Sequence, residues 1–464
     1  MARASVPDGV APRRPGRGAD SLGPGVRHRV GAVLMALTAF MGVGLVAGPV
    51  QAVAVGMPCA LPRTDAHHSL GLDTWNASYP RPEGTLDAAL LFLSFPDATP
   101  MATPRELVND HFPATSDFFK RASYGKLRLR PRPIDRWIRM PRPAAEYDIQ
   151  RDWRADLRNS YLRDAVAAAD PQVDFSRYDV VYLIADPDAP GVDPDATKVV
   201  NLNEPLHADG VELDRIVTVF EQSPPDRNVL AHETGHLFDL PDLYQRPADG
   251  KADWDTRVGD WDLMGSQFGL APEPFGWHKW KLGWLDRSNV ACIPTTGDAA
   301  RQQAHAESPR TRYTLRPLTA PAHRARARHQ VRRPVAAGAG PPAAPEPAAP
   351  AAGADGVRLL VLRTGAHRAL VMEIRERAGN DAGACSEGLL IYRVSSDTPS
   401  THGPVEVVDG HPGTSRCRET SVHSQLADAP LGVGESWSDP RDALRVEVTG
   451  RTPEGDWELR VVRE

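Results

Sequence analysis

Cysteine and net charge are both scarce in this chain of 464 residues. It has only four cysteines, so at most two internal disulfides can form. The formal net charge is −6, which is small for this length, and no basic stripe carries interleaved aromatic residues. The sequence therefore gives no support for a nucleic-acid partner. A hydrophobic content of 41% and a charged content of 25% are typical of a globular protein with roughly two to four domains.

One long run without charge lies near the N-terminus. It extends from Val30 to Ala54, follows Arg27 and Arg29, and ends in small residues at Ala52 and Ala54 that suit an A-x-A type cleavage site. This layout is typical of a secretory signal peptide. An uncleaved membrane anchor is the alternative, because the run approaches spanning length. Gly, Pro and Gln near its end favour cleavage, so we expect a secreted, extracellular protein with no stable membrane association afterwards.

Hydrophobic patterning divides the remaining chain into two kinds of region. Apolar runs at 86–95 and 178–191 predict buried strands, and 151–170 predicts a helix because apolar residues return at three- and four-residue steps. Alternating strands and helices indicate a mixed α/β region. The Pro/Ala/Gly-rich stretch 320–356 cannot build a packed core and is predicted to be a linker or insertion. Period-two runs after it predict an all-β sandwich.

The stretch "LAHETGHLFDLPDLY", residues 230–244, carries the strongest chemical signal. His232 and His236 are spaced i, i+4, so on a helix both imidazoles project from one face and can bind one Zn²⁺. Glu233 lies beside the first histidine, where it can act as the general base. Ser223 is the predicted N-cap of this helix, which we expect to extend from Asp226 to Phe238. Two surface or core histidines would be the structural alternative.

A third protein ligand is required, and two models compete for it. In one model a glutamate from a separate helix completes the site; in the other the helix ends early and a residue six positions after His236 does so. Pro241 disfavours continuation of the helix, so we predict Asp242 as the ligand. Asp239 is the competitor, but at i+3 on a helix it would point past the metal. A supporting role near the ligands is the expectation for Asp239.

These residues, together with "VGDWDLMGSQFGLAPEPFGWHKWKLGWL" (258–285), resemble the secreted bacterial metallopeptidases named after immune inhibitor A. The resemblance extends upstream to "ALLFLSFPD" and weakly downstream to "GLLIYRV". It implies a zinc endopeptidase of metzincin character, with His232, His236 and Asp242 as zinc ligands and Glu233 as the catalytic base. Met264 matches the methionine of the turn beneath the metal. The family usually has glycine in place of Asp239, and aspartate tolerates the left-handed conformation needed there.

Patterning and the resemblance together predict this domain order: a signal peptide (1–54), an N-terminal extended segment (55–84), a mixed α/β, metzincin-like catalytic domain (85–300), a connecting segment (301–319), the Pro/Ala-rich linker or insertion (320–356) and a C-terminal all-β sandwich (357–464). Protein or peptide substrates are the implied partners, and the oligomeric state is left open. The alternatives are an extracellular zinc-binding module without turnover and a zinc hydrolase that acts on something other than protein.

The cysteines of an exported protein are expected to form disulfides. Cys385 and Cys417 lie in one C-terminal region and should pair, which leaves Cys59 with Cys292. The alternative is that Cys59 caps the zinc as an inhibitory thiolate, which would leave Cys292 unpaired.

Several weaker signals surround the motif. Trp277, Trp280 and Trp284 fall at helical spacing and predict a core face, whereas His278 is expected at the surface. The acidic stretches 185–196 and 248–255 could offer oxygen ligands to Ca²⁺, although neither has a recognised loop spacing and solvated turns are the default. Tyr244 could donate to the oxyanion, but a packed aromatic is the simpler expectation.

Overall fold

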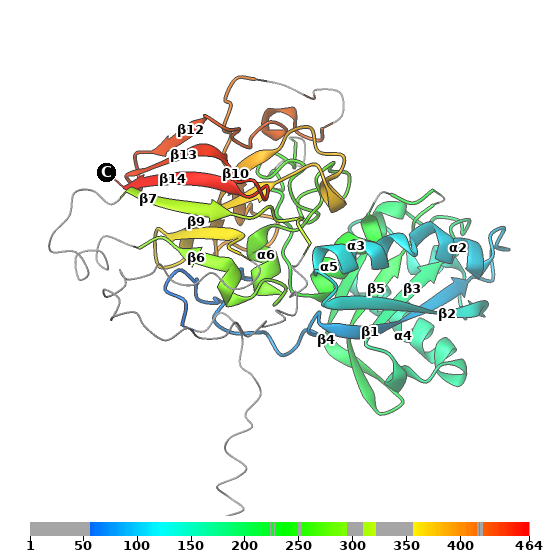
Figure 1. Cartoon of the computed structure of the whole chain (residues 1–464). Helices are drawn as coiled ribbons and strands as arrows, with labels where there is room; N and C mark the ends of the chain where they lie inside the picture. The colour runs from blue at the N-terminus through cyan, green and yellow to red at the C-terminus, as the bar shows by residue number, and fades with distance from the viewer. Residues whose placement is uncertain are drawn as a thin grey trace, which may run out of the picture. The chain divides into compact units, whose positions relative to one another are not determined.

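The computed structural model describes residues 56–222, 224–226, 228–248, 253–294, 310–321, 356–414, 417 and 421–463. The expected signal peptide, 1–54, lies outside these residues, as does most of the Pro/Ala-rich stretch. The protein is a mixed α and β structure with three sheets and few helices in the described part (Figure 1). Within the described ranges, no helix has the length and apolarity to cross a membrane.

The first half of the described chain forms a five-stranded sheet in the order β2-β1-β3-β5-β4. Its strands are β1 (Gly84–Ser94), β2 (Leu127–Arg139), β3 (Val180–Ala185), β4 (Lys198–Ala208) and β5 (Val211–Val219). The two central strands, β1 and β3, have parallel neighbours, and β4 pairs antiparallel with β5 at one edge. Every side chain of β3 is buried, as expected for a parallel strand covered on both faces. The predicted strands at 86–95 and 178–191 are therefore confirmed.

Helices cover both faces of this sheet, as Figure 1 shows. They are α2 (Pro104–His111), α3 (Ala114–Ala122) and α5 (Val229–Leu237) on one face and α4 (Ala155–Ala169) on the other. Alternate side chains of β1 enter the two cores: Leu90 and Phe92 join the first, and Leu91 and Leu93 join the second. The predicted helix at 151–170 corresponds to α4.

The helix that carries the two histidines begins later than its sequence predicts. We expected it to start at Asp226, but α5 starts at Val229 and no side chain caps it. Asn228 takes a left-handed conformation with φ of 59°, which interrupts the helical path, so the helix can only begin after it. The predicted cap, Ser223, lies outside the described residues.

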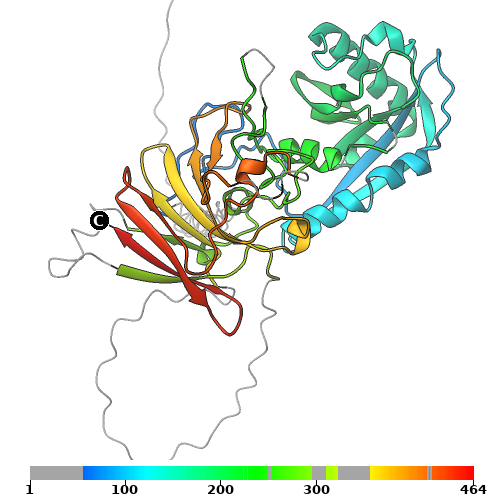
Figure 2. The same ribbon diagram turned by 90° about the horizontal axis from the view of Figure 1, so that it is seen from above.

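The second half of the chain forms two further sheets that face each other, seen as separate layers in Figure 2. One has the order β11-β10-β9-β8-β6 and the other β12-β13-β14-β7. Their strands are β6 (Val290–Cys292), β7 (Arg310–Leu315), β8 (Leu359–Arg363), β9 (Arg368–Arg375), β10 (Gly388–Ser395), β11 (Val405–Val407), β12 (Ser436–Asp439), β13 (Leu444–Arg451) and β14 (Trp457–Arg463). Strands β6 and β7 precede the Pro/Ala-rich stretch, so these sheets draw on both sides of it.

Both faces of the β8–β10 sheet are buried. One face, with Leu360 and Ile391, packs against the β13–β14 sheet, and the other, with Leu359 and Tyr392, joins the core of the first half. Helix α6 (Gly276–Lys281) packs on the face that carries Leu359: a Cβ added to Gly276 would lie 2.5 Å from Leu359 Cδ1. The two halves thus share a hydrophobic core, which is how segments far apart in sequence reach one site.

Candidate metal centre

Helix α5 presents two buried histidines on one face. Backbone carbonyls accept from the Nδ1 side of each ring: His232 Nδ1 lies 2.9 Å from Leu263 O, and His236 Nδ1 lies 2.8 Å from Leu240 O. Since a carbonyl can only accept, both Nδ1 atoms carry a proton, and the lone pairs are left on Nε2. This pairing is the usual way in which a protein orients metal-binding histidines.

The chain turns back immediately after α5 and brings Asp242 to the histidines. Asp239 has φ of 62°, and Leu240 N donates to Gly235 O at 3.2 Å, which ends the helix. Asp242 Oδ1 then lies 3.2 Å from His232 Nε2 and 3.1 Å from His236 Nε2. Ligand atoms about 2.0–2.1 Å from a tetrahedral zinc are about 3.3 Å apart. The separation of Asp242 Oδ1 from each Nε2 atom is therefore close to that expected between two ligands of one zinc ion.

Glu233 is a second carboxylate close to the histidines. One of its oxygens and one nitrogen of each imidazole all lie within 4.8 Å of one another. However, Glu233 Oε2 accepts a hydrogen bond from Val199 N at 2.8 Å, so this carboxylate is held by the edge strand β4. Asp242 makes the closer approach to both Nε2 atoms, and we assign it as the third ligand of the candidate site.

The electrostatics of the cluster favour positive charge between these groups. Burial acts to lower the pKa of His236, but the Asp242 carboxylate outweighs it and raises that pKa to about 9. Conversely, burial acts to raise the pKa of Asp242, but the two imidazoles hold it well below its ordinary value. The negative potential that raises the pKa of His236 also favours a metal cation, which would displace the competing proton from Nε2.

Asp239 lies outside the ligand set. Its Oδ2 accepts from Arg63 at 2.7 Å and lies 3.2 Å from Lys281 Nζ, while its Oδ1 lies 3.0 Å from His68 Nδ1. Burial acts to raise the pKa of Asp239, but Lys281, His68 and Arg63 together hold it well below its ordinary value. The carboxylate therefore remains charged, and the ring of His68 stacks on His236 with 5.7 Å between centroids.

Met264 lies directly beneath α5, in the methionine turn (residues 262–265). A Cβ added to Gly235 would come within 2.5 Å of Met264 Sδ, so the helix and the turn pack without space between them. Asp262 holds the turn by accepting from Met264 N at 2.7 Å and Phe275 N at 2.6 Å. His278, expected at the surface, is instead fully buried, with Nδ1 2.9 Å from Asp262 Oδ2. The prediction for His278 was therefore wrong. The prediction that Trp277, Trp280 and Trp284 form a core face is confirmed, and His278 is buried among them.

A cavity of about 790 Å³ opens over the ligands and Glu233. It is bordered by Val199 of β4 and by Tyr244, whose ring packs 5.2 Å from that of Trp254. Burial, with Asp242 and Glu233 nearby, raises the pKa of Tyr244 well above its ordinary value. The hydroxyl therefore stays protonated, and a hydrogen bond with Asp242 contributes to this.

Residues far from the motif also border the site, and sequence patterns did not reveal them. Ser400 accepts from Asp242 N at 2.9 Å and donates to Asp242 Oδ2 at 3.2 Å, although 158 positions separate them. His67 and His68 line the cavity from the N-terminal segment. The only available signal was the pair of adjacent histidines, because serine is too common to stand out.

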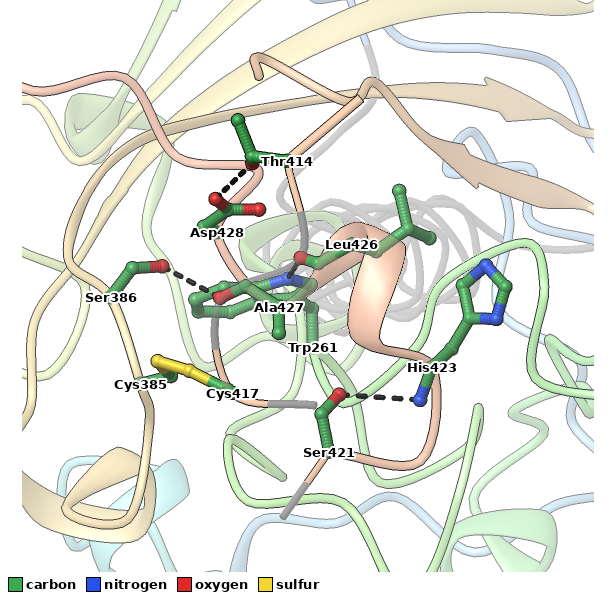
Figure 3. Close-up of a disulfide and its surroundings, with 10 residues drawn as sticks. All are labelled: Trp261, Cys385, Ser386, Thr414, Cys417, Ser421, His423, Leu426, Ala427 and Asp428. Carbon is green, nitrogen blue, oxygen red and sulfur yellow. Dashed lines mark hydrogen bonds between the residues drawn. A yellow bond between two sulfur atoms is a disulfide. The ribbon is translucent and has the colours of Figure 1, made fainter. Parts of the chain in front are cut away.

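Figure 3 shows the surroundings of the C-terminal disulfide, which include the neighbours in sequence of Val422, a residue that borders the cavity. Cys385 pairs with Cys417, and in the chain that follows, Leu426 O accepts from the indole of Trp261 at 2.7 Å. Val422 lines the cavity and donates its backbone N–H to Asp260 at 2.9 Å. Cys59 pairs with Cys292. Both expected pairings are confirmed, and the bridge to Cys292 overturns the alternative in which Cys59 caps the metal.

Within the described residues, no second group of three or more His, Cys, Asp or Glu side chains close enough to share an ion lies away from the cluster around His232, Glu233 and His236. The acidic stretch 185–196 does not gather such a group, and residues 249–252 of the other stretch lie outside the described part.

In comparisons with protein-family models and with curated proteins, no family model and no curated protein matched the chain.

Proposed function

We propose that this chain is a secreted, zinc-dependent endopeptidase that hydrolyses peptide bonds in extracellular proteins. The observation that carries the proposal is the position of Asp242 Oδ1, within 3.2 Å of both Nε2 atoms, with both Nδ1 atoms held by carbonyls. The resemblance to immune inhibitor A-type metallopeptidases favours peptides as substrates over other hydrolysable molecules. Two disulfides favour an exported protein.

The proposed chemistry divides between the metal and Glu233. Zinc, when bound by His232, His236 and Asp242, supplies the Lewis acidity that activates water and polarises a peptide carbonyl. One oxygen of Glu233 is held by Val199 N, which fixes the carboxylate at the cavity, so that it can accept a proton from water and return it to the leaving amine. Tyr244, kept protonated by its surroundings, is the candidate donor to the developing oxyanion.

The test compares zinc content and casein cleavage of the wild type with Glu233→Gln and Asp242→Ala. We expect about one zinc per chain in the wild type and in Glu233→Gln, with cleavage reduced by about 10²–10⁴-fold in the latter because the general base is lost. Asp242→Ala should lose both zinc and activity. A wild type that binds zinc but cleaves no protein would favour the binding-module alternative, and one that binds no zinc would refute the proposal.

A further inference from the structure

The third ligand is held by the loop between β10 and β11, which we define as the ligand loop (residues 396–403). Three backbone hydrogen bonds join it to the chain after α5: Thr401 N to Asp242 O at 3.2 Å, Gly403 N to Tyr244 O at 3.3 Å, and Arg246 N to Thr401 O at 2.9 Å. This short ladder places Ser400 against the Asp242 carboxylate. The segment that carries Asp242 is therefore held by the loop between β10 and β11 as well as by α5.

Ser400 sets the orientation of the carboxylate. Its hydroxyl accepts from Asp242 N and donates to Asp242 Oδ2, so both ends of that residue are fixed by one side chain. With Oδ2 engaged, Oδ1 is the oxygen turned toward the two imidazoles. A hydroxyl in this position selects one rotamer of a ligand that could otherwise turn away.

The N-terminal loop (residues 61–72) holds the opposite side of the site. Arg63 and His68 bind Asp239, the residue that ends α5, and His68 stacks on the ligand His236. The loop folds back tightly on itself: Leu72 N donates to Leu61 O at 2.8 Å, and a Cβ added to Gly71 would fall 2.2 Å from the Arg63 backbone. Its position is fixed further by Lys281, which donates to Ser69 O at 2.9 Å.

The two loops are bonded to each other. Thr64 and Ser69 both donate their hydroxyls to Ser396 O, at 2.6 and 2.7 Å, and Ser400 N donates to His67 O at 3.3 Å. His68 and Ser400 are thus neighbours within one hydrogen-bonded unit, although they come from opposite ends of the described chain. One end of this unit contacts His236 and the other contacts Asp242.

We propose that the N-terminal loop and the ligand loop form a single clamp that sets the geometry of the metal ligands. His68 is its positioning residue toward His236, and Ser400 is its positioning residue toward Asp242. The inference rests on the proposed zinc site and goes beyond it. It assigns the N-terminal segment a permanent supporting role at the site, which contrasts with that of a removable inhibitory propeptide.

The experiment measures zinc affinity by competition with a chelator, and ligand geometry by the visible absorption spectrum of the Co²⁺-loaded protein. Ser400→Thr and Ser400→Val form a matched pair that differs only in the hydroxyl. His68→Ala and the Ser400→Val/His68→Ala double variant complete the cycle. Ser438→Ala and His207→Ala, exposed on β12 and β4, are the controls.

We expect Ser400→Val to bind zinc about 10–100-fold more weakly than Ser400→Thr, and His68→Ala to lose affinity by a similar factor, with altered Co²⁺ spectra. Because both residues act through one unit, the double variant should lose less than the product of the single losses. Equal affinity and spectra for the Val and Thr variants would overturn the role of Ser400, and a fully multiplicative double variant would overturn the single clamp. If the wild type bound no zinc, the proposed function itself would fail, which distinguishes the two failures.

Discussion

At the scale of single residues, the candidate site depends on positions where there is no room for a different side chain. Gly235 is such a position, because a Cβ there would meet Met264 Sδ at 2.5 Å. Neither α5 nor the methionine turn can retreat easily: Met264 is bonded through its backbone to Leu243 and Asp262. The sequence pattern H-E-x-x-H permits any residue at this position, but in this packing any residue larger than glycine requires the Met264 side chain to move.

We therefore predict that Gly235→Ala lowers the free energy of unfolding by about 1–3 kcal/mol, the usual cost of an overpacked core, and weakens zinc binding as well. Denaturant unfolding of the metal-free protein and chelator competition measure the two effects. Gly365→Ala is the matched control, because its Cβ would meet nothing closer than Arg368 Cβ at 3.7 Å. An unchanged free energy of unfolding in Gly235→Ala would contradict the prediction and show that Met264 moves aside at no cost.

His111, at the end of α2, is a second residue whose burial has a measurable consequence. Burial lowers its pKa to about 4, below the ordinary 6.5, so the native state favours the neutral ring. The unfolded state binds a proton first as the pH falls. The stability that His111 provides is therefore complete above pH 6.5 and is lost as the pH falls toward 4, by up to about 3 kcal/mol.

Replacing His111 with leucine should remove this part of the pH dependence. We expect the loss of unfolding free energy between pH 7 and pH 4.5 to be smaller in His111→Leu than in the wild type, as measured by urea unfolding at both values. His207→Leu, at an exposed position on β4, should keep the wild-type dependence. Identical pH profiles for wild type and His111→Leu would contradict the low native pKa.

At the scale of elements, hydrophobic periodicity predicted strands that have a pattern of their own and missed features that depend on distant parts of the chain. The period-two runs after the linker became β8, β9, β10, β11, β13 and β14, because a local hydrophobic pattern is a property of the run itself. Strands β4, β5, β6, β7 and β12 were not predicted, and β6 and β7 gain their partners, β8 and β14, only from beyond the Pro/Ala-rich stretch. The start of α5 was predicted at Asp226 and lies at Val229, because Asn228 takes a left-handed conformation that no sequence pattern identifies.

The same division applies to the candidate site. Asp242 could be assigned from the chain itself, because Pro241 and the six-residue spacing indicate an early helix end. Ser400 and His68 could not, because their contacts with Asp242 and Asp239 span 158 and 171 positions. Such contacts depend on how the sheets pack, and this is absent from any local pattern.

Helix α6 contributes one partner, Lys279, to a buried ion pair whose effect on the free energy of unfolding can be tested. Lys279 donates to Glu273, and both side chains are almost fully buried. Lys279→Met would leave the Glu273 carboxylate without its counter-charge, so we predict a loss of about 3–5 kcal/mol in unfolding free energy. Lys126→Met is the control: its pair with Asp286, at 2.8 Å, is much more exposed and should cost less than about 1 kcal/mol. Thermal and denaturant unfolding decide between these values, and a loss in Lys279→Met no larger than in Lys126→Met would refute the prediction.

At the scale of the whole molecule, the candidate site is assembled from both ends of the described chain. The Cys59–Cys292 bridge closes a separation of 233 positions, and Leu61 and Leu70 of the N-terminal loop are completely buried in the shared core. Trp277 of α6 donates its indole N–H to Leu70 O at 2.9 Å, which links this loop to the centre of the molecule. The N-terminal segment is consequently a structural part of the fold.

The described residues on the two sides of the Pro/Ala-rich stretch are hydrogen-bonded to each other. Arg316 N donates to Val357 O at 2.8 Å, and Arg358 donates to Pro317 O at 2.7 Å. We predict that replacing 323–355 by a Gly/Ser linker a quarter as long leaves zinc affinity unchanged and raises the unfolding free energy by about 1 kcal/mol, since a shorter loop costs less entropy to close. Deleting 56–72, in contrast, should abolish zinc binding, because Cys59 and the buried Leu61 and Leu70 are lost together with His68 and Arg63. Circular dichroism melts and chelator competition on both variants measure the contrast; a linker variant that fails to fold would show that 323–355 contributes to the core.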